Sequence, residues 1–595
     1  MLDRRALIKL GLYGGSGALL HLTRLNSGAY AWALDEDDRD DDEREHHHKH
    51  HKHHKHGPPP PPPPPPFMLG LPLPPVKQKV DPSTLPGVQI FNDGIPTSYY
   101  EIHERQAAVP VLPGMPPTVV WGFDGIWPGP TLVANIGERV VLRMHNDLGG
   151  TNNSIVHHHG AHVASESDGS ALWSQQIYPG TFKDFVYPND DDIAATHWYH
   201  DHNIDFTGHN VFMGLEGFFP LHDAVELGLN LPGNPTNDPT PAGELPFDLP
   251  LVIQDRAFDA NAQLVYNPFS SRGFLGDMFA INGMIQPMAR VANRKYRLRI
   301  LNGSNARVYH LTLRTDQGAL IPFNIIGSDG GLYTKAVQVD GFTISPSERV
   351  EVVVDFSSLT PGSTTKVYLN NCMMQTDGRK PAGLVADCTN VPRTPGADGV
   401  GSLMSFDILF STTDNSSFTP DQALRSDLPV FNPADAMPPV PGTKPGATRD
   451  WEFVRGRGGE WLVNCFDGKG AQAFDPGPTP PALENPRVDA TVRVGDTEIW
   501  RLINGSGGWY HPIHIHRNQF QILDRIDSGS GKSLGLLPTQ LGLKDVFVLE
   551  QNVSIKLITK YTNGPHTTQT GKYVMHCHNV EHEDMAMMIV WECNP

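Results

Sequence analysis

Residues 495–504 read Gly-Asp-Thr-Glu-Ile-Trp-Arg-Leu-Ile-Asn, and related stretches stand at 137–146 and 293–302. Each stretch begins with a turn residue, alternates apolar with polar side chains, and places an arginine three positions before a terminal asparagine. Such alternation is typical of a β-strand with one buried face. The copies lie about 150 to 200 residues apart, which is the spacing of single domains. The repeat therefore predicts an all-β protein made of three related β-sandwich domains.

The composition agrees with many short strands joined by turns. Charged residues make up only 19% of the chain, and it contains 58 glycines and 54 prolines. A chain of 595 residues is too long for one hydrophobic core. We expect domains at 88–225, 246–430 and 431–595, with a linker at 226–245.

The net charge of −19 argues against nucleic acid as a partner. After the N-terminal region, no segment is apolar enough to cross a bilayer. The charge leaves cations or neutral organic molecules open as partners, and we expect a small-molecule substrate. As a separate expectation, the protein is a monomer.

The first 33 residues resemble an export signal. Arg4 and Arg5 precede an apolar stretch at 7–22, and small residues near 29–33 offer a cleavage site. The paired arginines favour the twin-arginine route, and an ordinary secretory signal is the alternative. We expect the mature protein to be exported to the periplasm, the cell surface or the medium.

Residues 34–87 are expected to be disordered. An acidic run at 35–45 is followed by eight histidines within 46–56 and nine prolines at 58–66. The prolines predict an extended spacer. The histidine tract could bind copper or zinc loosely, or it could be a low-complexity tail without a role.

Four His-x-His motifs carry the chemistry. On a strand, residues i and i+2 lie on the same face, so each motif offers two imidazoles side by side. Eight imidazoles are too many for one metal ion but suit three. The four pairs are 157/159, 200/202, 514/516 and 576/578.

Cys577 stands between the last two of these histidines and should point to the opposite face of its strand. There it can join His511 and His582 around a separate metal. Two imidazoles, a thiolate and a weak thioether such as Met587 describe a blue copper site. Zinc would suit any single histidine cluster, but the four motifs together favour copper.

These motifs resemble those of the multicopper oxidases, the laccase group, over about residues 88–593. Residues 198–202 (Trp-Tyr-His-Asp-His) and the run from His576 to Asp584 look most like the spore-coat laccase and bilirubin oxidase branch. So does the strand at 296–302. The resemblance implies three cupredoxin-like Greek-key domains and four copper ions.

Carried over residue by residue, the resemblance implies that His511, Cys577 and His582 bind a type 1 copper, with Met587 axial. His157 and His514 would bind the type 2 copper. The type 3 pair would be bound by His159, His200, His202, His516, His576 and His578. The first motif departs from the family because a third histidine, His158, stands between its ligands, and strand alternation predicts that it faces away.

The resemblance also implies the reaction. A donor would give up single electrons near the edge of His511, close to the surface, and dioxygen would be reduced to water at the histidine cluster. Phenols, aromatic amines or a bilirubin-like pigment are the expected donors. The alternatives are a metal oxidase acting on Cu(I) or Mn(II), and a non-enzymatic copper-binding coat protein, which would not need all eight histidines.

Two acids match positions that relay protons in this branch. Asp168 lies nine residues after His159, and Glu583 follows His582. Reducing dioxygen to water consumes protons, and a nearby carboxyl group can supply them. The alternative is that each acid only orients a ligand histidine.

The remaining cysteines suggest two disulfides, Cys372–Cys388 and Cys465–Cys593, although sequence does not settle their connectivity. By resemblance, the 372–388 loop could lie against the type 1 site. The stretch at 505–510, just before His511, is the other candidate to line it.

Overall fold

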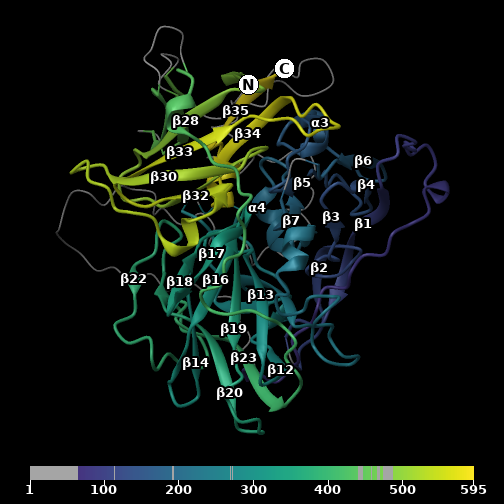
Figure 1. Ribbon diagram of the computed structural model, residues 1–595, viewed down its shortest axis with the longest axis vertical. Helices are drawn as coiled ribbons and strands as arrows, with labels where there is room; N and C mark the ends of the chain where they lie inside the picture. Colours follow the sequence, from purple (N-terminus) through teal and green to yellow (C-terminus); the bar gives the residue numbers. More distant parts are fainter. Residues whose placement is uncertain are drawn as a thin grey trace, which may run out of the picture.

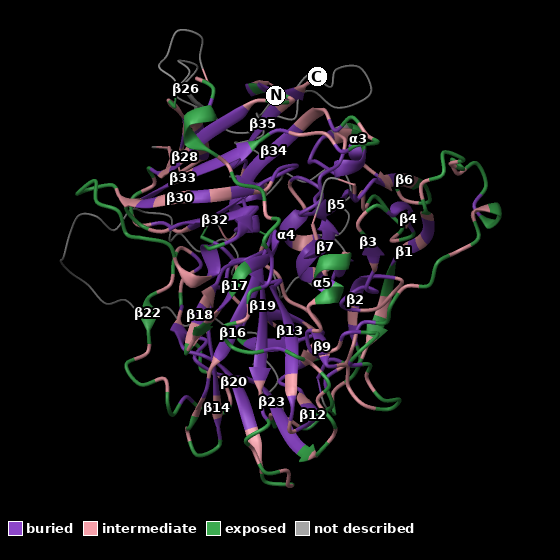
Figure 2. Ribbon diagram, viewed as in Figure 1, coloured by how far each residue is buried: buried purple, intermediate pink, exposed green. Residues whose placement is uncertain are grey.

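The computed structural model describes residues 65–595, except 113, 191–192, 269, 271, 440–445, 457–458, 466–469 and 473–486. Three pairs of sheets follow one another along the chain (Figure 1), which confirms the all-β architecture. Their strands are largely buried, and exposed residues gather in the connections (Figure 2). No helix in the described ranges is long and apolar enough to span a membrane.

The first pair of sheets lies within 97–222 and brings two of the histidine motifs to one sheet. One sheet has the order β2 (Thr118–Phe123), β1 (Thr97–Val109), β4 (Arg139–Asn146) and β6 (Phe182–Tyr187). The other has the order β3 (Ala134–Asn135), β8 (Glu216–His222), β7 (Ala195–Asp201) and β5 (Val156–His159).

The second pair lies within 248–410 and packs around the largest hydrophobic core. Its first sheet is ordered β11 (Met284–Ile285), β10 (Met278–Ile281), β9 (Asp248–Arg256), β13 (Lys295–Asn302), β19 (Arg349–Asp355), β16 (Phe323–Ser328) and β17 (Gly331–Val339). Its second is ordered β12 (Met288–Ala292), β23 (Gly401–Phe410), β20 (Lys366–Asn371), β14 (Tyr309–Thr315) and β15 (Leu320–Ile321), with β18 (Gly341–Ile344) on β14.

The third pair lies within 448–594. One sheet is ordered β26 (Gly470–Gln472), β25 (Trp461–Cys465), β24 (Thr448–Arg455), β28 (Thr497–Asn504), β33 (Val553–Lys560), β30 (Phe520–Asp527) and β31 (Leu543–Lys544). The other is ordered β27 (Val488–Arg493), β35 (Met588–Asn594), β34 (Gly571–Cys577), β29 (His511–Ile515) and β32 (Val546–Leu549). This second sheet carries the other two histidine motifs.

The three repeated stretches form equivalent strands, β4, β13 and β28. Each lies parallel to the first long strand of its sheet, namely β1, β9 or β24, and antiparallel to β6, β19 or β33. The repeated arginine pairs with an aspartate on a neighbouring strand in all three copies, at N–O distances of 2.7, 2.9 and 3.0 Å. The terminal asparagine donates to backbone carbonyls that follow the strand. These contacts explain why both residues recur.

The segment at 65–87 corrects our expectation that order begins near residue 88. Leu71 is buried in the core of the second pair of sheets, and its amide donates to the carbonyl of Met288 at 2.7 Å. Further on, Lys77 donates to Thr131 in the first pair, and Leu85 is 2% exposed. The chain after the prolines is therefore packed against two domains. The export signal and the histidine tract lie outside the described residues.

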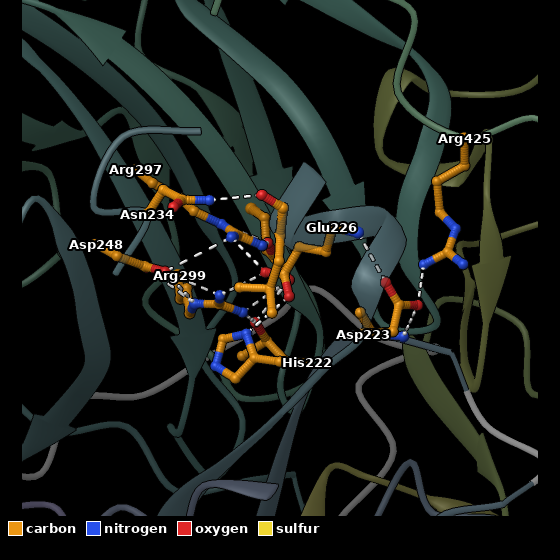
Figure 3. A network of polar contacts seen from close by, with 12 residues as sticks. His222, Asp223, Glu226, Asn234, Asp248, Arg297, Arg299 and Arg425 are labelled. Carbon is orange, nitrogen blue, oxygen red and sulfur yellow. Dashed lines mark hydrogen bonds and ion pairs between the residues drawn. The ribbon is translucent and has the colours of Figure 1, made fainter. Parts of the chain in front are cut away.

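The predicted linker begins inside α5 (Ala224–Gly228). A buried carboxylate in this helix forms ion pairs with the second pair of sheets. Glu226 lies 2.5 Å from Arg297 Nη1 and 3.1 Å from Arg299 Nη2, both on β13 (Figure 3). Although burial opposes it, the charge of Arg297 helps to hold the pKa of Glu226 well below its usual range. Glu226 therefore stays ionised and joins the first and second pairs of sheets.

A disulfide joins Cys372 and Cys388, as predicted, with the two Cα atoms 5.7 Å apart. It closes a loop that contains the short strands β21 (Met373–Met374) and β22 (Gly383–Leu384). The side chain of Cys465 lies outside the described residues, and Cys593 is buried without a described cysteine partner. The pairing Cys465–Cys593 therefore stays a prediction.

Candidate metal centres

The four His-x-His motifs meet between the first and third pairs of sheets. His157 pairs with His200 across β5 and β7, and His514 pairs with His576 across β29 and β34. All eight predicted imidazoles are at most 2% exposed. Because every motif lies on or at the end of a strand, each presents its two histidines to one face, as the spacing predicts.

Five of these histidines point ring nitrogens at one another. The Nε2 atoms of His202, His516 and His576 lie 3.1 to 3.3 Å apart. The Nε2 atoms of His157 and His514 form a separate pair at 3.3 Å. Nitrogens that converge so closely need a proton or a cation between them, because their lone pairs otherwise repel.

The other three histidines form a third group. His159, His200 and His578 have ring centroids 5.2 to 5.7 Å apart. His159 Nδ1, His200 Nε2 and His578 Nε2 are buried and have no hydrogen-bond partner among the described residues. Buried polar atoms rarely stay unpaired, so these nitrogens are suited to a ligand. The eight imidazoles thus divide into groups of two, three and three.

Asp168 and Asp545 contact outward-facing ring nitrogens of the cluster. The Asp168 backbone carbonyl accepts from His157 Nδ1 at 2.6 Å, and its carboxylate accepts from His516 Nδ1 at 2.8 Å. Asp545 accepts from His514 Nδ1 at its carbonyl, 2.9 Å away. Such contacts fix the tautomer and leave the inward nitrogen with a free lone pair, which is the state that binds metal.

The electrostatics also favour the metal-binding form. Burial lowers the pKa of His200 to about 3 and that of His202 to about 4, and neighbouring imidazoles contribute to both shifts. Burial and the other histidines likewise hold the pKa of His157 and His514 well below the usual range. These four rings are therefore neutral at ordinary pH, and neutral imidazole is the ligand form.

Cys577 lies on the opposite face of β34. Its Sγ is 3.5 Å from His511 Nδ1 and 3.6 Å from His582 Nδ1. Met587 is fully buried in the same core cluster, and its carbonyl accepts from the Cys577 amide at 3.0 Å. Burial raises the pKa of the Cys577 thiol well above its usual range, so a thiolate here needs a bound cation. The donors present, two imidazoles and a sulfur, fit copper.

Comparison with known proteins agrees with this donor set. Two family models, both described as multicopper oxidase, match residues 106–225 and 460–595. A bilirubin oxidase from Albifimbria verrucaria is 32% identical, over 88% of this chain and 80% of that protein. A laccase from Bacillus subtilis is 30% identical, over 85% of this chain and 96% of that protein. The chain belongs to the multicopper oxidase family.

Solved structures extend the likeness to the fold. The oxidase resembles a laccase from Pediococcus acidilactici, with 27% identity, a TM-score of 0.67, and coverage of 90% of this chain and 95% of that one. It also resembles the multicopper oxidase McoA from Aquifex aeolicus, with 26% identity, a TM-score of 0.66, and coverage of 85% and 100%. These similarities confirm the cupredoxin-like fold. The oxidase is a copper-dependent oxidoreductase with dioxygen as acceptor.

His158, the extra histidine of the first motif, takes no part in the cluster of eight. Its ring stacks on Phe219 at 4.1 Å and lies 5.3 Å from the ring of His197. Burial lowers its pKa to about 3. His158 therefore serves as a neutral core residue on the far face of β5.

The two predicted relay acids both contact the cluster. Glu583, on α6 (Val580–Asp584), has Oε2 at 2.9 Å from His576 Nδ1 and Oε1 at 3.3 Å from His202 Nδ1. Although burial opposes it, the neighbouring imidazoles hold the pKa of Glu583 well below its usual range. Burial raises the pKa of Asp168 to about 7. The two acids therefore contact the cluster with different proton affinities.

Sequence reasoning missed Asp545, which contacts the cluster at two points. Besides its carbonyl contact with His514, its carboxylate lies 3.1 Å from His159 Nε2. Arg349 of the middle domain holds the same carboxylate at 2.6 and 2.7 Å. Asp545 belongs to no histidine motif, so only the three-dimensional structure reveals it.

The position of His511 corrects our expectation of an edge near the surface. The ring is fully buried. Trp461 lies over it at 5.3 Å and over His582 at 4.1 Å, while Trp509 lies 5.6 Å from His582. His511 Nε2 contacts the Ser506 hydroxyl at 2.7 Å, and Ser506 lies in the partly exposed stretch at 505–510.

Proposed function

We propose that the oxidase removes single electrons from phenols and other small aromatic donors and reduces dioxygen to water. Four donor molecules each lose one electron and one proton, and one dioxygen takes up four of each to give two waters. The observation that carries the proposal is the end of strand β34, where Cys577 faces one centre while His576 and the next residue after the strand, His578, face the other. Electrons taken near Cys577 then have a short covalent route to the cluster.

The proposal includes four copper ions. His511, Cys577 and His582, with Met587 axial, would hold the type 1 ion. The pair His157 and His514 would hold the type 2 ion. Of the type 3 ions, one would be held by His159, His200 and His578, and the other by His202, His516 and His576. Bound copper supplies the one-electron redox chemistry that no side chain of this site can provide.

The protein itself orients the ligand histidines and excludes water from the cluster. Asp168, Asp545 and Glu583 fix the ligand imidazoles from outside, and full burial keeps water away from the cluster. Asp168 and Glu583 are also proposed as the groups that hold and pass protons for water formation. Both side chains are fully buried beside the ring nitrogens they contact.

Names of relatives favour aromatic donors over metal ions. A bilirubin oxidase and laccases stand among the most similar proteins. Thioethers favour Cu(I), but Met373, Met587 and Met588 are all buried. A purely copper-binding coat protein would not require the complete set of eight buried imidazoles. We further propose that residues 1–33 direct export and that the mature protein is a monomer.

Oxygen uptake with a panel of donors tests the function. We expect copper-loaded enzyme to consume dioxygen with 2,6-dimethoxyphenol, an aromatic diamine or bilirubin, and much more slowly with Cu(I) or Mn(II). Uptake with Cu(I) or Mn(II) alone would show that the metal-oxidase alternative is right. No uptake with any donor would favour a binding protein.

Replacing Met587 with leucine tests the axial assignment. Loss of a weak thioether donor to Cu(II) should raise the reduction potential of the blue site while its colour remains. Met588→Leu is the matched control, because Met588 packs in a different core cluster, with Val574 and Val590. Redox titration of both variants decides the matter. An unchanged potential in Met587→Leu would show that Met587 is not axial.

A further inference from the structure

Two arginines stack on the tryptophans that lie beside His511 and His582 of the Cys577 centre. The guanidinium carbon of Arg455, the last residue of β24, lies 5.5 Å from the ring centre of Trp461 and 4.8 Å from that of Trp509. Arg379 lies 4.9 Å from the ring centre of Trp509. The tryptophans are fully or nearly fully buried, whereas both arginines are half-buried. Both guanidinium groups therefore lie closer to solvent than the tryptophans on which they stack.

Arg379 is placed there by the disulfide loop of the middle domain. The loop closed by Cys372 and Cys388 reaches the third pair of sheets, where the Tyr510 amide donates to the Arg379 carbonyl at 3.1 Å. The Arg379 guanidinium also lies close to Gly508, where an added Cβ would be 3.0 Å from Arg379 Nη2. Tyr510 directly precedes His511, so the loop is anchored one residue from a ligand of the proposed type 1 site.

Among the described residues, neither of these guanidinium groups forms an ion pair with a carboxylate, and Arg455 Nε donates to the Gly459 carbonyl at 3.5 Å. Asp377, two residues before Arg379, pairs with Arg272 at 3.0 Å. Arg379 Nε is buried and has no hydrogen-bond partner in the described part of the chain.

We propose that Arg379 and Arg455 form a binding site for the anionic group of the reducing substrate, so that the oxidase prefers aromatic donors with a carboxylate or sulfonate. The inference rests on the proposed function. Guanidinium groups pair with such anions through two parallel N–H donors, and stacking on tryptophan orders them beforehand. An anion held there places the aromatic ring of the donor beside these guanidinium groups. The stacked arginines and tryptophans then lie between the donor and His582.

The test uses two donors that differ only in charge, 3-(4-hydroxy-3,5-dimethoxyphenyl)propanoate and its methyl ester. Two methylenes isolate the phenol from the charge, so ring electronics are matched. For the wild-type holoenzyme at low ionic strength, we expect kcat/KM for the acid to exceed that for the ester by about tenfold. Added salt should reduce this ratio, because the attraction is electrostatic and partly exposed to solvent.

Substitutions then identify the residues responsible. Arg379→Gln and Arg455→Gln should each lower the acid-to-ester ratio by about threefold, and the double variant should bring it close to one. Arg379→Lys should keep part of the preference, since it retains the charge but not the planar fork. Arg290→Gln, an exposed arginine on β12, is the matched control and should leave the ratio unchanged. An intact blue absorption band in each variant shows that the copper site is preserved.

A ratio that responds neither to salt nor to the double substitution would overturn the proposal. If the wild type oxidises neither donor, the proposed function is overturned instead. The anion site is then tested by measuring the dissociation constant of 3-phenylpropanoate, which has no oxidisable phenol. Binding that is severalfold weaker in the double variant supports the anion site, and equal binding refutes it.

Discussion

A Cys577→Ser variant is expected to be colourless and to lose oxidation of every donor. Cys577 Sγ is the only sulfur within 3.6 Å of both His511 Nδ1 and His582 Nδ1 among the described contacts, and a serine hydroxyl is a poor ligand for copper. Loss should exceed about 100-fold, the larger effect seen when only outer contacts of a metal site are removed. Visible absorption and oxygen uptake measure both outcomes.

The copper content of the Cys577→Ser variant distinguishes loss of the type 1 site from a general folding defect. None of the eight imidazoles belongs to the proposed type 1 site, so the Cys577→Ser variant should still bind three copper ions per chain. A fully loaded variant that retains wild-type activity would reject the assignment of Cys577. Loss of all four ions would indicate a folding defect, which circular dichroism would detect.

Asp168→Asn and Glu583→Gln are expected to slow the oxygen half-reaction while electron uptake stays normal. Water formation takes four protons, and imidazoles bound to metal have none to give readily. Both acids lie within 3 Å of a ring nitrogen in the cluster. Loss of general acid catalysis typically costs about 10²- to 10⁴-fold. Stopped-flow reoxidation of the reduced enzyme by dioxygen measures this step separately from reduction by the donor.

The matched control is Glu581→Gln. Glu581 is also buried on α6, but its carboxylate accepts from Tyr266 and Asn305, each at 2.8 Å, and contacts no ligand histidine of the cluster. Its variant should reoxidise normally. The relay variants should also shift their activity toward acid, where solvent protons can replace the lost carrier. Normal reoxidation in both would discard the relay, and loss of copper would indicate that the acids only orient their histidines.

Local periodicity allowed much of the fold and site to be predicted. The repeat at 137–146, 293–302 and 495–504 is visible in sequence because each copy must pair an arginine with a strand neighbour and end on a capping asparagine. The His-x-His motifs are visible because a strand places residues i and i+2 on one face. Alternation likewise predicts that Cys577 faces away from His576 and His578.

Contacts between distant segments could not be predicted in the same way. Asp545 reaches His159 across 386 positions of sequence, and no pattern around it suggests a role. Burial of His511 depends on Trp461, fifty residues away on another sheet. The division of the imidazoles into groups of two, three and three depends on which nitrogens converge. The order of residues 65–87 could not be predicted, because composition does not reveal that Leu71 packs in a core formed by later strands.

The stoichiometry of the reaction tests the central claim most directly. With a phenolic donor and copper-loaded enzyme, an oxygen electrode and the donor's absorbance together give the number of donor molecules oxidised per dioxygen. The account predicts four, with no oxygen returned when catalase is added. A ratio of two, with half of the oxygen recovered through catalase, would mean that the product is hydrogen peroxide. Four-electron reduction by the histidine cluster would then be wrong.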